Sequence, residues 1–345
     1  RHLILKSPVG VVGAIAPWNF PLVLSLRKVA AALAAGCPVI LKPASATPIC
    51  AVKLAECIEA AGFPRGVFQL VVGKASEIGS EMLENPLCRK ISFTGSTEIG
   101  KRLIEGAAKT CTRLSLELGG NAPLLIFADA DLDKAVEGAI IAKFRNTGQS
   151  CVASNRIYVE RSVFDAFVEK FVAATKALKI GYGLEEGMDI GPLIDEAGCE
   201  STLRFVEDAK AKGARVLCGG TRGDGDGVFV TPAVLVDLSE DALCMSEEIF
   251  APVAPVIPFD TEEEVVRLAN DTEYGLAAYA FTSDLNRALR LAEQLEAGTV
   301  GINESVPATS NCPFGGFKQS GWGRELGTEG MEAYLETKHV SIGGV

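Results

Sequence analysis

The stretch Lys90-Ile91-Ser92-Phe93-Thr94-Gly95-Ser96-Thr97-Glu98-Ile99-Gly100 joins an apolar strand to the start of a helix. The same change, from a short apolar run to a helical spacing of apolar residues, recurs through the first 120 residues. Strands that alternate with helices in this way are typical of a parallel sheet covered on both faces. The sequence therefore predicts an α/β fold.

The predicted elements of this region follow one another as strand and helix. They are strands at 11–16, 39–41, 67–72, 90–93 and 113–118, and helices at 21–35, 47–61, 77–84 and 96–108. The turn Gly119-Gly120-Asn121 is a candidate domain boundary. A second α/β region follows, with predicted helices at 131–144, 161–178, 261–270 and 284–297, strands at 152–159, 276–281 and 298–302, and a terminal strand at 334–342.

Composition limits the class of protein. A length of 345 residues suggests about two domains. The net charge of −11 disfavours nucleic acid and anionic membranes as partners. No run of about 18 apolar residues occurs, so we expect no transmembrane helix. The ten cysteines form no CxxC pair, which predicts reduced thiols and a cytoplasmic location. The chain starts without methionine, so we expect a missing N-terminal part and leave organellar targeting open.

Metal binding is not expected. The two histidines, His2 and His339, lie one at each end of the chain, which argues against a zinc site. The run Asp224-Gly225-Asp226-Gly227 resembles the start of a calcium loop, but Leu235 occupies the position of the closing glutamate.

Cys151 lies in the polar, glycine-containing stretch 144–153, which follows an apolar helical pattern. A substrate can reach a thiol in such a setting, so we predict that Cys151 is a nucleophile. The alternatives are a buried small hydrophobic residue or an unreactive surface thiol. Other cysteines fit a buried role because they lie in or beside apolar elements; they are Cys37, Cys57, Cys88 and Cys111.

Two further residues suit catalysis. Glu117 lies in an apolar strand, where burial raises the pKa of a carboxyl group and makes it a candidate general base. The alternative is a salt-bridged structural glutamate. Asn19 lies between Pro17 and Pro21, where its amide can be aimed at a developing oxyanion. The alternative is an N-cap of the following helix.

Two segments at the ends of predicted strands suit an anionic ligand. Thr94-Gly95-Ser96 opens a helix whose N–H groups can hold a phosphate, or it is an ordinary capped helix start. Lys42 can bind ribose hydroxyls or a phosphate, or it is a solvated lysine. The fingerprint GxGxxG is absent, which argues against a standard dinucleotide-binding Rossmann fold.

Seven short motifs follow one another along the chain. They are Pro17-Trp18-Asn19-Phe20-Pro21, Lys42-Pro43-Ala44-Ser45, Phe93-Thr94-Gly95-Ser96, Leu116-Glu117-Leu118-Gly119-Gly120-Asn121, Gly148-Gln149-Ser150-Cys151, Glu247-Glu248-Ile249-Phe250 and Pro313-Phe314-Gly315-Gly316. In combination and in this order, they resemble those of the NAD(P)-dependent aldehyde dehydrogenase family, and the resemblance covers essentially the whole chain. The family has an atypical Rossmann domain without GxGxxG, which accounts for the absence of that fingerprint.

The resemblance implies an aldehyde-dehydrogenase-like α/β architecture. It assigns an oligomerisation strand to 1–8, an NAD(P)-binding domain without its N-terminal part to 9–119, and a catalytic domain to 120–322. A C-terminal segment with a second oligomerisation strand occupies 323–345. We therefore expect a homo-oligomer, either a dimer or a tetramer.

The resemblance also implies the roles of individual residues. Cys151 attacks the aldehyde carbon, the Asn19 amide and the Cys151 N–H hold the oxyanion, and Glu117 activates the water that hydrolyses the thioester. Ser45 stands where strictly NAD-using relatives often carry a glutamate, so we expect NADP⁺ to be preferred over NAD⁺. The residues assigned to the cofactor are Trp18, Lys42, Ser45, Gly95, Ser96, Glu248 and Phe250.

Within the family, the chain is most similar to succinate-semialdehyde dehydrogenases. Arg27 and Arg145 match two arginines that hold the substrate carboxylate there, or they are two exposed helix arginines. Phe314 lines the substrate pocket, and Ala308 or Thr309 falls near a serine that usually touches the carboxylate. We expect oxidation of succinate semialdehyde. The alternatives are glutarate semialdehyde, a broad aliphatic or betaine aldehyde, and a catalytically inactive structural relative.

Overall fold

The computed structural model describes residues 1–223 and 227–344, so Asp224 to Asp226 of the segment compared with a calcium loop lie outside the described residues. The chain forms two compact units, and the predicted α/β fold is confirmed in both. Unit 1 comprises Arg1–Leu118, Ala308–Gly316 and Ser320–Val345, and unit 2 comprises Gly119–Pro307 and Phe317–Gln319. The assignment of cofactor-binding, catalytic and oligomerisation roles to segments stays a prediction.

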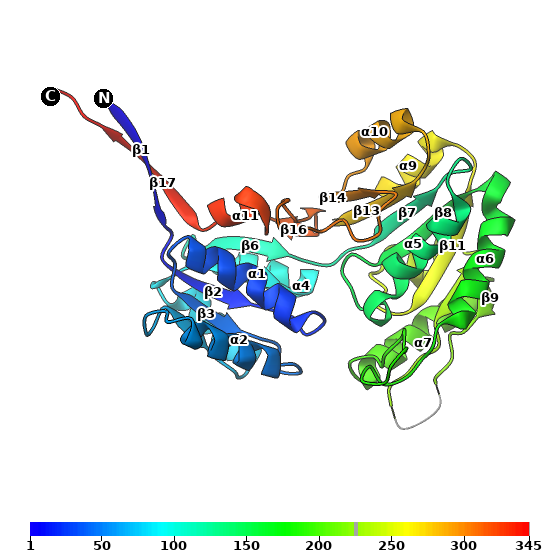
Figure 1. The fold of residues 1–345 in the computed structure, drawn as a ribbon, viewed down its shortest axis with the longest axis horizontal. Coiled ribbons are helices and arrows are strands. Elements are labelled where there is room, and N and C mark those ends of the chain that lie inside the picture. Colours follow the sequence, from blue (N-terminus) through cyan, green and yellow to red (C-terminus); the bar gives the residue numbers. More distant parts are fainter. Residues whose placement is uncertain (224–226, 345) are drawn as a thin grey trace. The chain divides into compact units, whose positions relative to one another are not determined.

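Unit 1 is built on a six-stranded sheet (Figure 1). In spatial order its strands are β16 (Gly321–Trp322), β6 (Arg113–Glu117), β5 (Cys88–Thr94), β2 (Val11–Ile15), β3 (Val39–Lys42) and β4 (Phe68–Leu70). Neighbouring strands are parallel except for β16, which is antiparallel to β6.

Helices cover both faces of this sheet. On one face, α1 and α2 pack on Val12 and Leu41, and on the other, α3 and α4 pack on Ile91 and Phe93. Helix α1 begins at Pro21, since proline is well tolerated in the first helical turn. The helices of unit 1 are α1 (Pro21–Ala34), α2 (Ile49–Ala60), α3 (Ala75–Glu84), α4 (Thr97–Ala107) and α11 (Gly327–Glu332).

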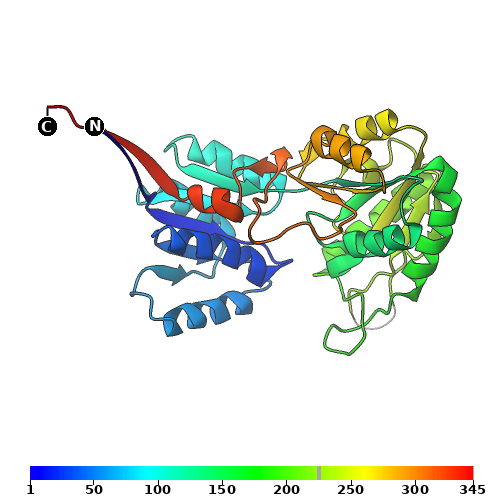
Figure 2. The same cartoon turned by 45° about the horizontal axis from the view of Figure 1, so that its top comes forward.

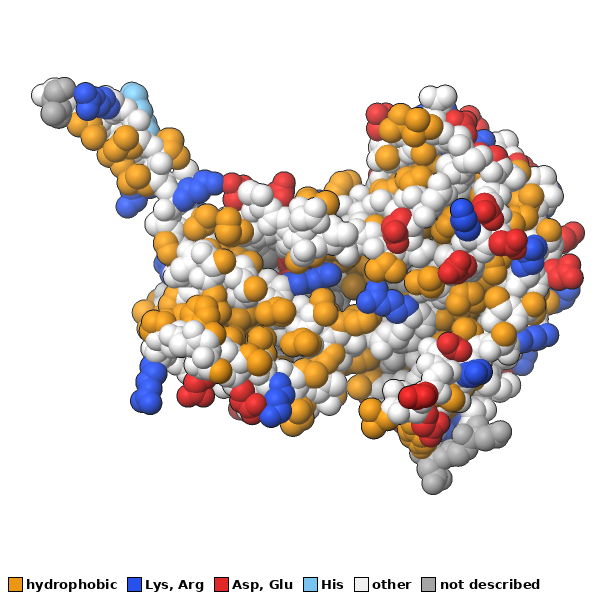
Figure 3. Space-filling view, in the orientation of Figure 1, with side chains coloured by type: hydrophobic (Ala, Val, Ile, Leu, Met, Phe, Trp, Pro, Cys, Tyr) orange, Lys and Arg blue, Asp and Glu red, His pale blue; other side chains and the backbone are white. Residues whose placement is uncertain are grey.

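Two strands of unit 1 lie outside the sheet. β1 (His2–Pro8) and β17 (Leu335–Ser341) pair antiparallel as a ribbon that leads to both chain termini (Figures 1 and 2). Apolar side chains lie along it (Figure 3), and Leu3, Ile4 and Leu5 are exposed. The ribbon therefore carries apolar surface that nothing in the described chain covers.

Unit 2 has a seven-stranded sheet. In spatial order its strands are β14 (Thr299–Ile302), β13 (Ala277–Phe281), β7 (Ala122–Ile126), β8 (Ser154–Glu160), β11 (Val253–Phe259), β10 (Ala233–Val236) and β9 (Arg215–Cys218). Only β9 is antiparallel to its neighbour. Two short strands, β12 (Tyr274–Gly275) and β15 (Phe317–Lys318), form a separate antiparallel pair.

The helices of unit 2 bury the two faces of its sheet. Phe167 of α6 packs with Leu124 and Ile157 on one face, and Leu291 of α10 packs with Leu125 on the other. The helices are α5 (Leu132–Phe144), α6 (Phe164–Ala177), α7 (Glu196–Ala211), α8 (Leu243–Ser246), α9 (Glu262–Asn270) and α10 (Leu285–Gln294), with short 3₁₀ turns at Arg145–Gly148 and Arg161–Val163.

The sequence patterns missed several elements of unit 2, which include β7, α7, β9, β10 and β11. Strands β7 and β10 are buried at every position, so they lack the alternation that marks a half-exposed strand. Strand β11 contains Pro255 and Pro258, which argue against a strand in sequence-based reasoning. Helix α7 is polar overall and buries a narrow stripe that includes Phe205 and Val206.

No helix in the described part of the chain is both long and apolar enough to cross a membrane. Within residues 1–223 and 227–344, no cluster of three or more histidine, cysteine, aspartate or glutamate side chains is placed to hold a metal ion.

Candidate active site

Unit 1 brings its predicted site residues to the carboxyl ends of neighbouring parallel strands. Glu117 ends β6, Gly95 follows β5, Asn19 follows β2, and Lys42 ends β3. The chain places β3 and β4 on one side of β2, and β5 and β6 on the other. Ligands in open parallel sheets bind at such a reversal of strand order, outside the carboxyl ends.

Glu117 is buried, and neither of its carboxylate oxygens has a hydrogen-bond partner among the described residues. Burial raises the pKa of Glu117 well above its usual range, and the charge of Glu325 raises it further. The charges of Lys28, Arg324 and Arg27 oppose this increase. The structure does not support a salt-bridged structural glutamate, because no ion pair is formed by Glu117 within the described chain.

Lys28 and Glu325 form a buried ion pair in unit 1. The Lys28 ammonium also donates to Thr94 Oγ1 at 2.6 Å, and Thr94 is the register partner of Glu117 on the neighbouring strand. Sequence reasoning missed this pair. The available signal was a lysine at an inward-facing position of α1, beside Leu24 and Val29.

The predicted cofactor residues of unit 1 differ in exposure. Ser96 is exposed, and its hydroxyl accepts the N–H of Ile99 at 3.4 Å, so it caps α4. Ser45 is also exposed, whereas Trp18 is partly buried. Lys42 is buried, its pKa is lowered by that burial, and its ammonium has no acceptor among the described residues.

Asn19 and Gly95 lie in the segments that connect β2 to α1 and β5 to α4. The N-cap of α1 is Phe20 and has no side-chain cap, so the capping alternative for Asn19 does not apply. A Cβ atom on Gly95 would lie 2.5 Å from the ring of Phe93, so a larger residue fits after β5 only if that ring moves.

Three predicted substrate residues of unit 1 surround or adjoin one cavity. The cavity has a volume of about 470 Å³, and its walls include Arg27, Thr309 and apolar side chains of α1 such as Val23 and Leu26. The Arg27 guanidinium lies over the ring of buried Phe314, 4.9 Å from its centroid. Arg27 is the one charged residue among the described residues that line this cavity.

In unit 2, the predicted site residues Cys151 and Glu248 lie at the amino ends of the strands, together with Gly120 and Tyr274. The segments that enter four adjacent parallel strands carry Gly120 before β7, Cys151 before β8, Glu248 before β11 and Tyr274 before β13. Because these strands are neighbours and parallel, their amino ends meet at one edge. The site of unit 2 therefore lies at the amino ends, where the general rule for open sheets does not place a ligand.

The loop before Cys151 has an unusual backbone. Asn146, Thr147 and Gly148 have φ values of 54°, 58° and 73°, in the left-handed region. That region costs a residue other than glycine about 1–2 kcal/mol, and a β-branched residue is rare there. Such local strain is found at functional sites, where the surroundings hold it. Cys151 itself is partly exposed.

Hydrogen bonds hold this loop in place. The Gln149 amide donates to the carbonyl of Asn146 at 3.2 Å and accepts the N–H of Ile194 at 2.9 Å. The Thr147 hydroxyl donates to the carbonyl of Gly191 at 3.0 Å. The segment that includes Gly191 and Ile194 therefore fixes the approach to Cys151.

Gly120 contacts both Glu248 and the loop that leads to the nucleophile, residues 146–151, which we call the nucleophile loop. Its N–H donates to Glu248 Oε1 at 3.1 Å, and a Cβ atom on it would lie 2.2 Å from the carbonyl oxygen of Cys151. Burial raises the pKa of Glu248 to about 7, against the lowering effect of the Gly120 N–H. Phe250 has a φ of 48°, a strained conformation for an aromatic residue. Arg145 is exposed and caps the C-terminus of α5.

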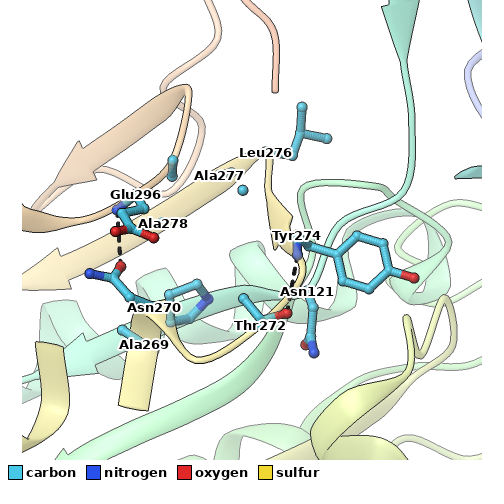
Figure 4. Close-up of a pocket in the computed structure, with 12 residues that line it drawn as sticks. Asn121, Ala269, Asn270, Thr272, Tyr274, Leu276, Ala277, Ala278 and Glu296 are labelled. Atoms are coloured by element: carbon cyan, nitrogen blue, oxygen red, sulfur yellow. Dashed lines mark hydrogen bonds between the residues drawn. The ribbon is translucent and has the colours of Figure 1, made fainter. Parts of the chain in front are cut away.

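A hydrogen bond joins Asn121, which precedes β7, to the segment that leads to Glu248. Its amide donates to the carbonyl of Met245 at 3.2 Å. Asn121 and Tyr274 line a narrow cavity of about 10 Å³ (Figure 4), which has room for about one water molecule.

Comparisons with known proteins identify the class. The profile of the aldehyde dehydrogenase family matches residues 1–340. The chain therefore belongs to the aldehyde dehydrogenase family, which confirms the resemblance, and it is an NAD(P)-dependent aldehyde dehydrogenase.

Two curated relatives and one solved structure show how similar the chain is to particular members. It is 52% identical over 343 residues to the NADP⁺-dependent succinate-semialdehyde dehydrogenase of Escherichia coli, of which it covers 71%. It is 51% identical over 345 residues to the glutarate-semialdehyde dehydrogenase of Pseudomonas aeruginosa, again covering 71% of the relative. A crystal structure of an NADP-dependent enzyme from E. coli matches 99% of this chain, and 71% of its own, with a TM-score of 0.97 and 52% identity.

Proposed function

We propose that this protein oxidises succinate semialdehyde to succinate, with NADP⁺ preferred over NAD⁺. The observation that carries the proposal is the single guanidinium of Arg27 in an otherwise uncharged cavity of about 470 Å³. A guanidinium is suited to bidentate binding of a carboxylate, and its stacking on Phe314 reduces the entropy lost on binding. Arg145 is the second proposed carboxylate ligand, and Thr309 is a hydroxyl donor on the cavity wall.

The proposed chemistry begins with attack of the Cys151 thiolate on the aldehyde carbon, which gives a thiohemiacetal. The Asn19 amide and the Cys151 N–H donate hydrogen bonds to the oxyanion. When bound, NADP⁺ supplies the acceptor for the hydride that this intermediate loses on becoming a thioester. Water then hydrolyses the thioester and frees the carboxylate product and the Cys151 thiol.

Glu117 is the proposed base for that water. Its raised pKa and its unpaired oxygens suit a group that must take up a proton near neutral pH. Glu117→Gln keeps the shape of the side chain and removes the base. We expect a burst of about one NADPH per active site followed by steady-state turnover at least about 100-fold slower than wild type. A steady-state rate within about twofold of wild type would exclude Glu117 from hydrolysis.

The cofactor assignment is supported by the chemistry of unit 1. Lys42 is largely buried and its ammonium has no acceptor among the described residues, which suits ribose hydroxyls or a phosphate. Gly95 and the capped start of α4 suit close approach of an anion. Exposed Ser45 carries no charge that would repel a 2′-phosphate. In unit 2, Glu248 and Phe250 are proposed to hold the nicotinamide riboside. A higher kcat/KM with NAD⁺ than with NADP⁺ would contradict the preference.

The substrate proposal is tested with succinate semialdehyde, glutarate semialdehyde and uncharged butanal on wild type, Arg27→Ala and Arg145→Ala. Loss of one charged hydrogen-bond donor costs about 1.5–3 kcal/mol, so we expect KM for succinate semialdehyde to rise about 10- to 150-fold. KM for butanal should stay within about twofold. Arg102→Ala, which removes an exposed arginine of α4, is the matched control. Equal effects on butanal and succinate semialdehyde would refute the carboxylate role.

Glutarate semialdehyde is the second candidate, because the chain is as similar to a glutarate-semialdehyde dehydrogenase as to a succinate-semialdehyde dehydrogenase. It carries the same aldehyde and carboxylate, separated by one more methylene. One methylene is worth about 1–3 kcal/mol in a shaped pocket, so the ratio of the two kcat/KM values decides between them.

We further propose that the protein is a homo-oligomer joined through the β1–β17 ribbon. Exposed Leu3, Ile4 and Leu5 favour this, since strands with exposed apolar residues seek partner edges. Light scattering on wild type and on Ile4→Lys should show a dimer or tetramer that dissociates in the variant. A monomeric wild type would contradict the proposal.

A further inference from the structure

Lys143 is a buried lysine that the proposed reaction does not use. It lies in the last turn of α5 and is 0% exposed. No carboxylate of the described chain pairs with it, and its one hydrogen-bond partner there is Asn155. Burial lowers the pKa of Lys143 to about 7, opposed by nearby Cys244. A buried amine with a single neutral partner is destabilising, which calls for a reason for its presence.

The hydrogen bonds that start at Lys143 lead to the catalytic edge of unit 2. The Lys143 amine donates to Asn155 Oδ1 at 3.2 Å, and Asn155 Nδ2 donates to the carbonyl of Gly120 at 3.3 Å. The Gly120 N–H donates to Glu248 Oε1 at 3.1 Å. The two peptide groups that flank the Cα of Gly120 are therefore each held by a hydrogen bond, which fixes the conformation of that glycine.

The backbone of Gly120 also contacts the nucleophile loop directly. A Cβ atom there would lie 2.2 Å from the carbonyl oxygen of Cys151, so the two backbones are in direct contact. A rotation of either Gly120 peptide would change this contact and the position of the Glu248 carboxylate together. The freedom of an unsubstituted glycine makes such a rotation cheap unless neighbours prevent it.

We propose that Lys143 is a positioning residue: its amine orients the Asn155 amide, which holds the Gly120 carbonyl, and Gly120 in turn sets the places of Glu248 and Cys151. As an ammonium, the Lys143 side chain can only donate to Asn155 Oδ1, so the Nδ2 of that amide is directed at Gly120. Without the amine, Asn155 Oδ1 loses its donor, and the orientation of the amide depends on its hydrogen bond to the Gly120 carbonyl alone. The inference rests on the roles proposed above for Cys151 and Glu248.

Two substitutions separate positioning from simple support of the fold. Lys143→Met keeps the length of the side chain and removes the donor. Asn155→Asp keeps an acceptor for Lys143, now as an ion pair, but removes the donor to the Gly120 carbonyl. Lys134→Met, at the other end of α5 and exposed, is the matched control. Each variant is made in the full chain and compared with wild type. The quantities measured are kcat, KM for NADP⁺, the rate of Cys151 alkylation by iodoacetamide, and the melting temperature.

If Lys143 acts through Gly120, both Lys143→Met and Asn155→Asp raise KM for NADP⁺ and lower kcat, each by about 10-fold, and change the alkylation rate. The double variant is then no worse than either single variant, because one chain of contacts is broken in each. The control stays within about twofold of wild type.

Kinetic constants within about twofold of wild type in Asn155→Asp would overturn the inference, whatever its melting temperature. Asn155→Asp keeps the inference open to refutation even when Lys143→Met does not fold, because the proposed chain of contacts passes through the Asn155 amide. Cys151→Ala separates this result from the proposed function, since full activity in Cys151→Ala would refute the nucleophile assignment itself.

Discussion

Lys143→Met should change how the stability of unit 2 depends on pH. The pKa of Lys143 is about 7 in the folded protein, below the ordinary value of 10.5. Between these two values the unfolded chain binds more protons than the folded chain, so wild-type stability rises with pH. Below pH 7 the lysine is protonated in both states, and the full cost of the buried charge is present. Integrated from pH 7 to pH 9, Lys143 alone adds about 2 kcal/mol to the free energy of unfolding.

Urea unfolding of wild type and Lys143→Met at pH 7, 8 and 9 measures this contribution. Far-ultraviolet circular dichroism is the appropriate signal, because the two tryptophans, Trp18 and Trp322, both lie in unit 1 and would report on the other unit. Every other titrating group is common to both proteins, so the difference between them isolates Lys143. The stability of Lys143→Met relative to wild type should fall by about 2 kcal/mol over this range.

The control for this measurement is Lys134→Met, whose curve should run parallel to that of wild type, because its side chain is exposed. Parallel curves for wild type and Lys143→Met would refute the reasoning. They would mean that the buried amine keeps an ordinary pKa or that water reaches it.

Substitutions at Gly120, Thr147 and the Lys28–Glu325 pair probe other parts of the structure. Gly120→Ala would place a methyl group 2.2 Å from the Cys151 carbonyl, so we expect at least about 100-fold lower kcat and a changed alkylation rate, with overpacking that costs about 1–3 kcal/mol in urea unfolding. Thr147→Val removes a hydroxyl that donates to a backbone carbonyl and should cost about 1–2 kcal/mol in the same assay, whereas Thr147→Ser should keep most of that stability; equal losses would contradict a role for the hydroxyl. Lys28→Met leaves Glu325 buried without its partner, which should cost about 3–5 kcal/mol by thermal unfolding, and adding Glu325→Gln should recover part of the loss.

The parts of the fold that the sequence predicts well are those with a clear period or boundary. Pro21 and Ser96 mark two helix starts within a residue of where the helices begin, because both act through local backbone chemistry. Some strands of unit 2 were harder to predict, since β7 and β10 are buried at every position and show no alternation of apolar and polar residues. Pro255 and Pro258 within β11 cannot donate to a neighbouring strand, and only the tertiary structure reveals how their strand is accommodated.

The candidate catalytic residues could also be predicted from the sequence, because each differs in polarity from its surroundings. A thiol in a polar loop, as at Cys151, and a carboxylate in an apolar strand, as at Glu117, are anomalies that can be seen in the sequence alone. The resemblance to a known family then assigned them complementary roles. Gly120 offered no such anomaly, because its importance lies in a contact with a residue 31 positions later in the numbering.

Buried lysines are the signal that sequence reasoning left unused. Lys28 and Lys143 each interrupt an apolar stretch of a helix, and each costs stability unless it has a partner or a task. The structure gives them different partners: Lys28 pairs with the carboxylate of Glu325, whereas Lys143, among the described residues, has only the neutral amide of Asn155. Replacement of a paired lysine exposes the cost of the charge left behind, but replacement of an unpaired one should stabilise the fold at neutral pH. If Lys143→Met is both more stable than wild type at pH 7 and slower in catalysis, the lysine has been retained for positioning at the expense of stability.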